Sequence, residues 1–210
     1  MTDVTLFLRE FARTRRETGA IAPSSPLLAR ALTRYVIPVP GRARKVLEVG
    51  SGTGAVTRHI QASLGRLDTL DLVEPNPRFA DLLRHDYRDD SRVRLLSGLV
   101  QDCELDSYDT IVCGLPFANF DAPTVDGILG QLLTALRPRG TLSFFAYAGI
   151  PPLRRAFTAG EARQRTLRTQ AVLERTLGRH RFRTETVLWN IPPARVHHLA
   201  PAAAELAYSD

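Results

Sequence analysis

A short glycine-rich segment of this 210-residue chain combines residue types that can hold a ligand against the main chain. Glu48 stands two residues before the first of three alternating glycines, Gly50, Gly52 and Gly54, and Ser51 lies inside the run. Glycine is favoured where a chain turns sharply from a strand into a helix and where a ligand touches the backbone. The segment therefore predicts a strand–turn–helix unit whose turn binds part of a small molecule.

A second acidic residue lies where a partner of this turn is expected. Glu74 ends the next apolar run and is followed by Pro75 and Asn76. A carboxylate about 20–25 residues beyond such a turn can accept both hydroxyls of a ribose. The glycines and Glu74 together predict a nucleoside-containing cofactor that lies across the carboxyl ends of the first strands.

Two nucleoside cofactors fit a glycine turn of this kind. The spacing from Gly50 through Gly52 to Ala55 satisfies a loose nicotinamide-dinucleotide fingerprint. S-adenosylmethionine is favoured by Glu48, whose carboxylate can orient the ammonium of the methionine end or the loop itself, and by the third glycine, Gly54. The pattern resembles the signature of class I S-adenosylmethionine-dependent methyltransferases. That resemblance implies a Rossmann-like α/β fold, with a seven-stranded sheet of order 3-2-1-4-5-7-6, an antiparallel strand 7 and helices on both faces.

Alternation of apolar strands and amphipathic helices agrees with this architecture. The pattern predicts strands over 45–49, 69–73, 93–96, 110–113, 142–147, 182–189 and 195–199, and helices over 3–18, from 25 onward, and over 53–64, 78–87, 124–136 and 155–177. The last two strands are too close in sequence for a parallel crossover, so we expect them to pair antiparallel. No repeat or linker divides the chain. We expect one domain over 1–210, with an N-terminal helical cover over 1–40 and a catalytic core over 41–200.

The segment after the third strand departs from the family pattern. Class I methyltransferases usually carry Gly-Asp-Ala here, and the carboxylate accepts a hydrogen bond from the adenine amino group. This chain has Gly98, Leu99 and Val100 instead. We expect Leu99 and Val100 to pack against the adenine ring, and Gln101 or Asp102 to replace the missing carboxylate.

The turn after the fourth strand is the predicted place of the methyl acceptor. Amine-methylating members of the fold carry Asn-Pro-Pro-Tyr or Asn-Leu-Pro-Tyr here, and this chain has Gly-Leu-Pro-Phe. Because Gly114 has no side-chain acceptor, the backbone carbonyls near Gly114 and Leu115 and the ring of Phe117 are the candidates for holding an amine and facing its positive charge. The alternative is a buried turn with Leu115 and Phe117 in the core.

Other residues that could act on an amine are fewer. Tyr147, just past the fifth strand, and Tyr35, near the N-terminal cover, are candidate acceptors or cation-facing rings. His59, His197 and His198 are interpreted as structural. No cluster of His, Cys, Asp and Glu has metal-ligand spacing, so we expect no metal.

Segments near both ends carry a narrower resemblance. The runs Gly-Ala-Ile-Ala-Pro-Ser-Ser at 19–25 and Asn-Ile-Pro-Pro-Ala at 190–194 are similar to those of bacterial phospholipid N-methyltransferases of the soluble type, which methylate phosphatidylethanolamine. The resemblance implies an N-terminal amphipathic helix that docks on anionic membrane and partly covers the cofactor. Over 3–18, two phenylalanines lie opposite three arginines, which suits a lipid interface. Packing of this helix on its own domain is the alternative.

Composition excludes several classes of protein. The chain is 44% hydrophobic and 24% charged, as globular proteins are, and it has no apolar run long enough for a membrane-spanning helix. Cys103 and Cys113 cannot form a disulfide framework or a four-ligand zinc site. We expect a cytoplasmic protein, with a peripheral position on the inner face of the cell membrane. The net charge is +6 and Lys45 is the only lysine; an arginine-rich surface suits an anionic partner, although solubility alone also explains it.

These observations predict an S-adenosylmethionine-dependent N-methyltransferase whose substrate is the amine of a phospholipid headgroup, phosphatidylethanolamine or its methylated forms. A small soluble metabolite and the adenine N6 of ribosomal RNA are alternative substrates. The glycine at 114 and the lack of an RNA-gripping domain argue against nucleic acid as a partner. A non-catalytic cofactor-binding protein is a further alternative, motivated by Leu99. The oligomeric state stays open.

Overall fold

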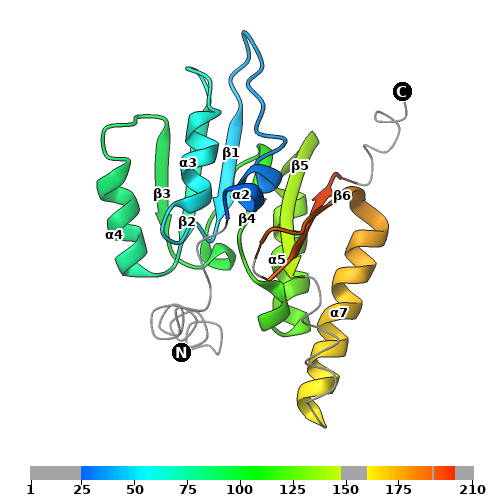
Figure 1. Ribbon diagram of the computed structural model, residues 1–210. Coiled ribbons are helices and arrows are strands. Elements are labelled where there is room, and N and C mark those ends of the chain that lie inside the picture. Colours follow the sequence, from blue (N-terminus) through cyan, green and yellow to red (C-terminus); the bar gives the residue numbers. More distant parts are fainter. Residues whose placement is uncertain (1–24, 148–159, 191, 202–210) are drawn as a thin grey trace.

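The chain forms one sheet of seven strands (Figure 1): β1 (Lys45–Val49), β2 (Thr69–Glu74), β3 (Val93–Ser97), β4 (Tyr108–Cys113), β5 (Leu136–Tyr147), β6 (Arg181–Val187) and β7 (Ala194–Leu199). Their order is β3-β2-β1-β4-β5-β7-β6. β7 runs antiparallel between β5 and β6, and the other pairs are parallel. The expected order and the antiparallel seventh strand are confirmed. The computed structural model describes residues 25–147, 160–190 and 192–201; the helix expected over 3–18 lies outside them.

Helices cover both faces of the sheet (Figure 1). One face packs against α2 (Pro26–Leu32), α3 (Ala55–Ala62) and α4 (Pro77–Asp86), and the other against α5 (Ala122–Thr134) and α7 (Glu161–His180). Two short 3-10 turns, η1 (Val100–Asp102) and η2 (Phe117–Asn119), follow β3 and β4. Val125, Ile128, Leu129 and Leu132 of α5 are all buried, which is the spacing of one helical face. The two buried clusters on either side of the sheet form the core.

The central strand explains why the site lies where it does. Residues 46–49 of β1 are all buried, as expected of a strand with parallel neighbours on both edges and helices on both faces. Val49 is level with Val73 of β2 and with Cys113 of β4. The turns that follow these three strands therefore meet at one place on the carboxyl edge of the sheet.

The helix starts follow from side-chain caps that the sequence supplies. The side chains of Ser25, Asn76 and Asp121 each accept a hydrogen bond from a main-chain N–H in the first turn of α2, α4 and α5. A proline stands in the first two positions of each of these helices, where its missing N–H costs nothing. The helix expected from residue 25 onward is confirmed, with Ser25 as its cap.

Two predicted element boundaries are wrong. A helix was expected over 124–136, but α5 ends at Thr134 and β5 already begins at Leu136. A register shift between Tyr108 and Thr110 of β4 accommodates Pro138 and Gly140 within β5. The second error concerns the closing hairpin, whose antiparallel pairing is confirmed. Its first strand ends at Val187, not at residue 189.

Candidate cofactor and substrate site

The glycine turn joins β1 to α3, as the sequence predicts. Gly50, Gly52 and Gly54 have φ values of +77°, +55° and +77°, a conformation that favours glycine. The Gly50 N–H donates to the Val73 carbonyl at 2.8 Å, so the turn is fixed to the end of β2. The Gly54 N–H donates to the Ser51 carbonyl at 3.0 Å, immediately before α3 begins. The turn therefore presents main-chain atoms to the carboxyl edge of the sheet.

Glu74 links this turn to the loop that follows β2. Its Oε2 accepts a hydrogen bond from the Gly52 N–H at 2.8 Å, and its Oε1 accepts one from the Asn76 N–H at 2.9 Å. A carboxylate has about four acceptor positions, so both bonds are compatible with the acceptance of ribose hydroxyls. The structure thus brings Glu74, Asn76 and the glycine turn together in one site.

Glu48 is buried beneath the turn and ties β1 to α3. Its side chain is 2% exposed, and its Oε2 accepts a hydrogen bond from the Thr57 hydroxyl at 2.6 Å. Burial raises the pKa of Glu48 to about 7, and the Thr57 hydroxyl opposes the shift. Of the two roles that the sequence allows, orientation of the loop is the one for which the structure gives contacts.

The pKa of Glu48 predicts how stability depends on pH. Between about pH 4.5 and pH 7 the folded protein keeps a proton on Glu48 that the unfolded chain has lost, so this group's stabilisation is lost as pH rises. We expect the free energy of unfolding of the wild type, relative to Glu48→Gln, to fall by about 3 kcal/mol from pH 4.5 to 7.5. Urea titrations across this range measure the difference. A difference for Glu48→Gln that stays constant across this range would contradict the buried acid.

An apolar slot opens beside Glu74. Gly50, Pro75, Leu99, Val100 and Leu115 line it, all of them predicted site residues. Apolar walls suit a flat aromatic base, and Glu74 stands between Val73 and Pro75, two residues that line the slot. The residues at this place therefore offer the chemistry of an adenosine site, with apolar side chains for the base and a carboxylate for the ribose hydroxyls.

Five further residues of the slot were missed or left open by the sequence, two of them at the strand ends, Val49 and Val73. Gln101 lines the slot and Asp102 does not. Of the two candidates to replace the missing carboxylate, Gln101 is therefore the one at the slot. Phe120 and Ile128 also line the slot, from the end of the turn after β4 and from α5. The aromatic residue that closes the motif at 114–120 was the available signal for Phe120, whereas Ile128 had none beyond its helical spacing.

Gly114 follows β4 and lies beside the end of β1. Its N–H donates to the Val49 carbonyl at 2.8 Å. A Cβ at this position would stand 3.0 Å from the Gly50 carbonyl oxygen. The two turns therefore pass close to each other, and a larger residue at 114 would require one of them to shift.

The expectation that Phe117 faces an amine is wrong. Its side chain is 2% exposed, and its ring packs edge-on against Phe144 at 5.3 Å between centroids. Leu115 is buried as well, and its carbonyl accepts the Phe117 N–H at 3.0 Å. The alternative of a buried turn is therefore correct, with the qualification that Leu115 also lines the slot.

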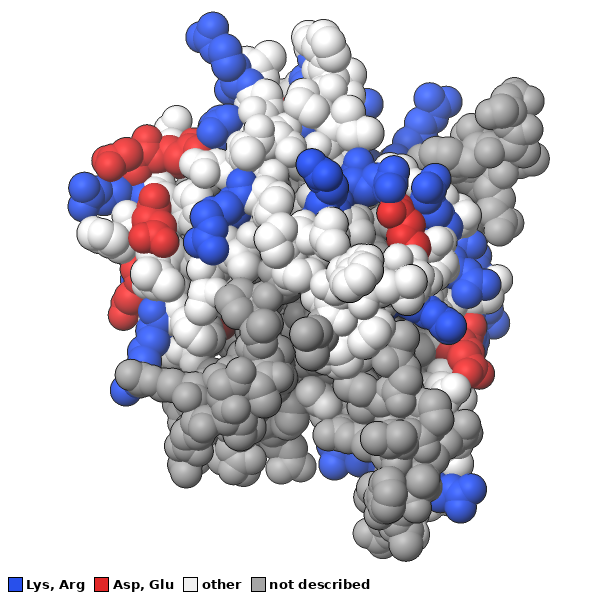
Figure 2. All heavy atoms as spheres, viewed as in Figure 1, with Lys and Arg blue, Asp and Glu red and all other residues white. Residues whose placement is uncertain are grey.

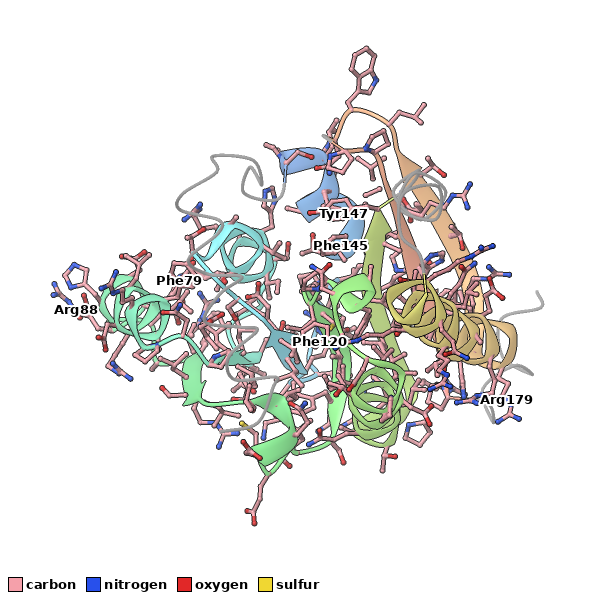
Figure 3. The ribbon with its side chains drawn as sticks, turned by 90° about the horizontal axis from the view of Figure 1, so that it is seen from below. Phe79, Arg88, Phe120, Phe145, Tyr147 and Arg179 are labelled. Atoms are coloured by element: carbon pink, nitrogen blue, oxygen red, sulfur yellow. The ribbon has the colours of Figure 1, made fainter. Side chains whose placement is uncertain are left out.

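The two tyrosines lie at opposite edges of the sheet. Tyr147 ends β5 at the carboxyl edge and packs against Phe145, with 5.0 Å between ring centroids. Figure 3, which looks onto that edge, shows these two rings side by side. The Tyr35 carbonyl instead accepts a hydrogen bond from Thr110, near the start of β4. Its ring packs on His198 at 4.8 Å, so Tyr35 is a packing residue at the amino edge and not a member of the site.

The histidines of β7 are buried within the sheet. Burial lowers the pKa of both His197 and His198 to about 4, so they are neutral near pH 7. His198 hydrogen-bonds Ser143 through Nδ1 at 2.8 Å and Glu185 through Nε2 at 3.2 Å. These contacts agree with the structural role that the sequence suggested. Among the described residues, no three His, Cys, Asp or Glu side chains come together as metal ligands.

Comparisons with known proteins place this chain in a family. A model described as a methyltransferase domain matches residues 47–142. The ornithine lipid N-methyltransferase of Singulisphaera acidiphila is 31% identical over 150 residues, which cover 68% of this chain and 77% of that protein. A probable ribosomal RNA small subunit methyltransferase A of Haloquadratum walsbyi is 30% identical over 96 residues, 44% of this chain and 28% of that protein.

Solved structures agree at the level of the fold. An O-methyltransferase from Bacillus cereus in complex with SAH superposes with a TM-score of 0.62 at 15% identity, over 95% of this chain and 92% of that one. Sheet order, the glycine turn with its acidic partner, and the sequence relationship all point the same way. The chain therefore belongs to the class I methyltransferases and uses S-adenosylmethionine as its methyl donor.

Proposed function

We propose that this enzyme methylates the amine of a membrane-lipid headgroup, with phosphatidylethanolamine or its methylated forms as substrate. The observation that carries the proposal is the 31% identity to an ornithine lipid N-methyltransferase over most of that protein's length. Ethanolamine and ornithine headgroups both present a primary amine on an amphiphile. Ornithine lipid is accordingly the second candidate substrate.

The described residues suggest how the methyl donor is held. S-adenosylmethionine would supply a methyl group on a sulfonium: an uncharged amine would form the N–C bond as the C–S bond breaks in line, with S-adenosylhomocysteine as the leaving group. In our proposal Glu74 accepts the ribose hydroxyls, the slot between Pro75 and Leu99 holds the adenine, and the turn at Gly50 seats the methionine end. The reactive end of the donor then lies next to Gly114, because the ends of β1 and β4 are adjacent.

The acceptor amine has to be aligned with the donor and kept from water. Alignment of two reactants can contribute about 7–11 kcal/mol to lowering a barrier. The Gly114 carbonyl accepts no hydrogen bond from the described residues, whereas the Leu115 carbonyl is bonded to Phe117. We propose that the Gly114 carbonyl orients the amine and that Tyr147, rather than Phe117, faces its growing positive charge.

A membrane-lipid substrate requires the enzyme to act at a membrane surface. No helix in the described part of the chain is long and apolar enough to cross a bilayer. We propose peripheral action on the cytoplasmic face of the membrane, helped by the amphipathic segment at 3–18. Ribosomal RNA is a weaker candidate, because the match to the RNA enzyme spans little of that protein and Gly114 offers no side-chain amide.

Transfer of a radiolabelled methyl group to defined acceptors tests the proposal. We expect label in the lipid fraction of vesicles that contain phosphatidylethanolamine, and none in free phosphoethanolamine or in ribosomal RNA. Vesicles with ornithine lipid separate the two lipid candidates. Label in RNA or in a soluble amine alone would contradict the lipid assignment, and Glu74→Gln is the inactive control for each acceptor.

A further inference from the structure

The turn between β6 and β7 exposes the most accessible apolar side chains of the described residues. Trp189 is 86% exposed and Leu188 69%. Leu27, at the start of α2, is 47% exposed and lines the same groove of about 500 Å³ together with Arg30 and both turn residues. An exposed cluster of one large aromatic and two leucines is the kind of surface that marks an interaction site.

This turn is anchored at its base. Val187 and Ala194, which flank it, are buried and paired with each other across the hairpin. Asn190, 6% exposed, donates from its side-chain amide to the Pro192 carbonyl at 2.7 Å. The backbone therefore holds Leu188 and Trp189 outward on a closed turn.

The turn is also placed beside the site. Val187 is level with Ala194, and Ala194 is level with Tyr147, so the turn projects from the carboxyl edge where β5 ends. Two strand spacings, about 10 Å, separate the ends of β5 and β6. A surface that covered this turn would lie close to the proposed position of the amine.

The charge around the turn favours an anionic partner. The groove contains Arg30, Arg34 and the single acid Glu185. Glu185 is already ion-paired with Arg34 and with Arg183, so the rim is net positive. Figure 2 shows this face of the molecule, where Lys and Arg side chains gather above a central uncharged area.

We propose that Leu27, Leu188 and Trp189, rimmed by Arg30 and Arg34, form a membrane-docking surface for an anionic lipid bilayer. Tryptophan prefers the headgroup region, where its ring is covered and its N–H stays hydrated. Arginines at the rim bind lipid phosphates. The inference rests on the proposed lipid substrate. It adds a docking surface on the catalytic domain that is separate from the N-terminal segment.

Trp189 is the only tryptophan of the chain, so its fluorescence reports on this surface alone. In the full-length protein we expect emission typical of water, a shift to shorter wavelength on adding vesicles with phosphatidylglycerol, and quenching by brominated acyl chains. Neutral phosphatidylcholine vesicles should give a much smaller shift. An unchanged spectrum with anionic vesicles would overturn the proposal. Emission already shifted in the free protein, or shifted by raising protein concentration alone, would show that the chain itself or a second copy covers the turn.

A matched pair of variants measures the contribution to binding. Leu188→Ser, which keeps the reporter, and Leu188→Ser with Trp189→Ser should weaken co-sedimentation with anionic vesicles by about tenfold or more. The control is Leu67→Ser, 64% exposed but next to the start of β2 at the opposite edge of the sheet; it should bind as the wild type does. The docking surface would be overturned if the control lost as much binding as the docking variants, or if none of the variants lost binding.

A second readout separates this proposal from the proposed function. With lipid dispersed in detergent micelles, the docking variants should methylate at the wild-type rate, because no bilayer has to be bound. If vesicles shift the Trp189 emission but neither the wild type nor the variants methylate lipid, the proposed function is refuted and the docking surface is supported. If lipid is methylated in micelles but vesicles do not change the Trp189 emission, the docking surface is refuted and the proposed function is supported.

Discussion

Replacement of Glu74 by glutamine is expected to weaken binding of S-adenosylmethionine by about a hundredfold or more. The side chain is 5% exposed, and its two oxygens accept the Gly52 and Asn76 N–H groups. A glutamine amide nitrogen cannot accept, so one backbone donor would face another donor. A ribose hydroxyl bonded to a carboxylate contributes about 1.5–3 kcal/mol, and two such bonds would be weakened together.

Calorimetric titration with S-adenosylmethionine measures this loss, and methyl transfer should fall with it. Glu104→Gln removes an exposed carboxylate elsewhere and should leave the affinity unchanged. The thermal midpoint of Glu74→Gln has to be recorded alongside, because the same change loosens the glycine turn. An affinity within about threefold of the wild type would mean that the ribose is not held by Glu74.

The second large effect concerns Gly50. An added Cβ would stand 2.9 Å from Cδ2 of Leu115, at a φ of +77°. Leu115 lines the adenine slot, so the collision moves a wall of the proposed pocket. We expect Gly50→Ala to lower the affinity for S-adenosylmethionine by about tenfold or more and to lose about 1–2 kcal/mol of stability from the strained backbone.

Gly41→Ala is the matched control for this substitution. Gly41 has a φ of +73° but nothing within 4 Å of an added Cβ. Both variants therefore carry similar backbone strain, and only Gly50→Ala should lose cofactor affinity. If both lost affinity equally, general destabilisation rather than the contact with Leu115 would be the cause.

The part of the site next to the glycine turn could be predicted because sequence spacing fixes its geometry. Gly50 follows β1 and Glu74 ends β2, and adjacent parallel strands end at the same edge. The side chain of Phe117 could not be placed in this way, because an aromatic after a turn can point to the core or to a ligand. Phe144, on a neighbouring strand, decides the outcome.

Two other differences depend on contacts that lie far apart in the sequence. Tyr35 was expected near the ligand because it lies near the N-terminal cover, but the hydrogen bond that its carbonyl accepts from Thr110 places it at the amino edge. Leu188 and Trp189 continue the apolar pattern of a strand, yet pairing stops at Val187 opposite Ala194. These two apolar residues therefore lie in an exposed turn and not in a strand. The chemical identity of the acceptor is a further gap, since a backbone carbonyl and a tyrosine ring suit many amines.

The most direct test of the cofactor site is a crystal structure with S-adenosylhomocysteine bound. Both ribose hydroxyls should lie within hydrogen-bond distance of the Glu74 carboxylate, with the adenine between Pro75 and Leu99. A ligand bound elsewhere, or a ribose turned away from Glu74, would contradict the account.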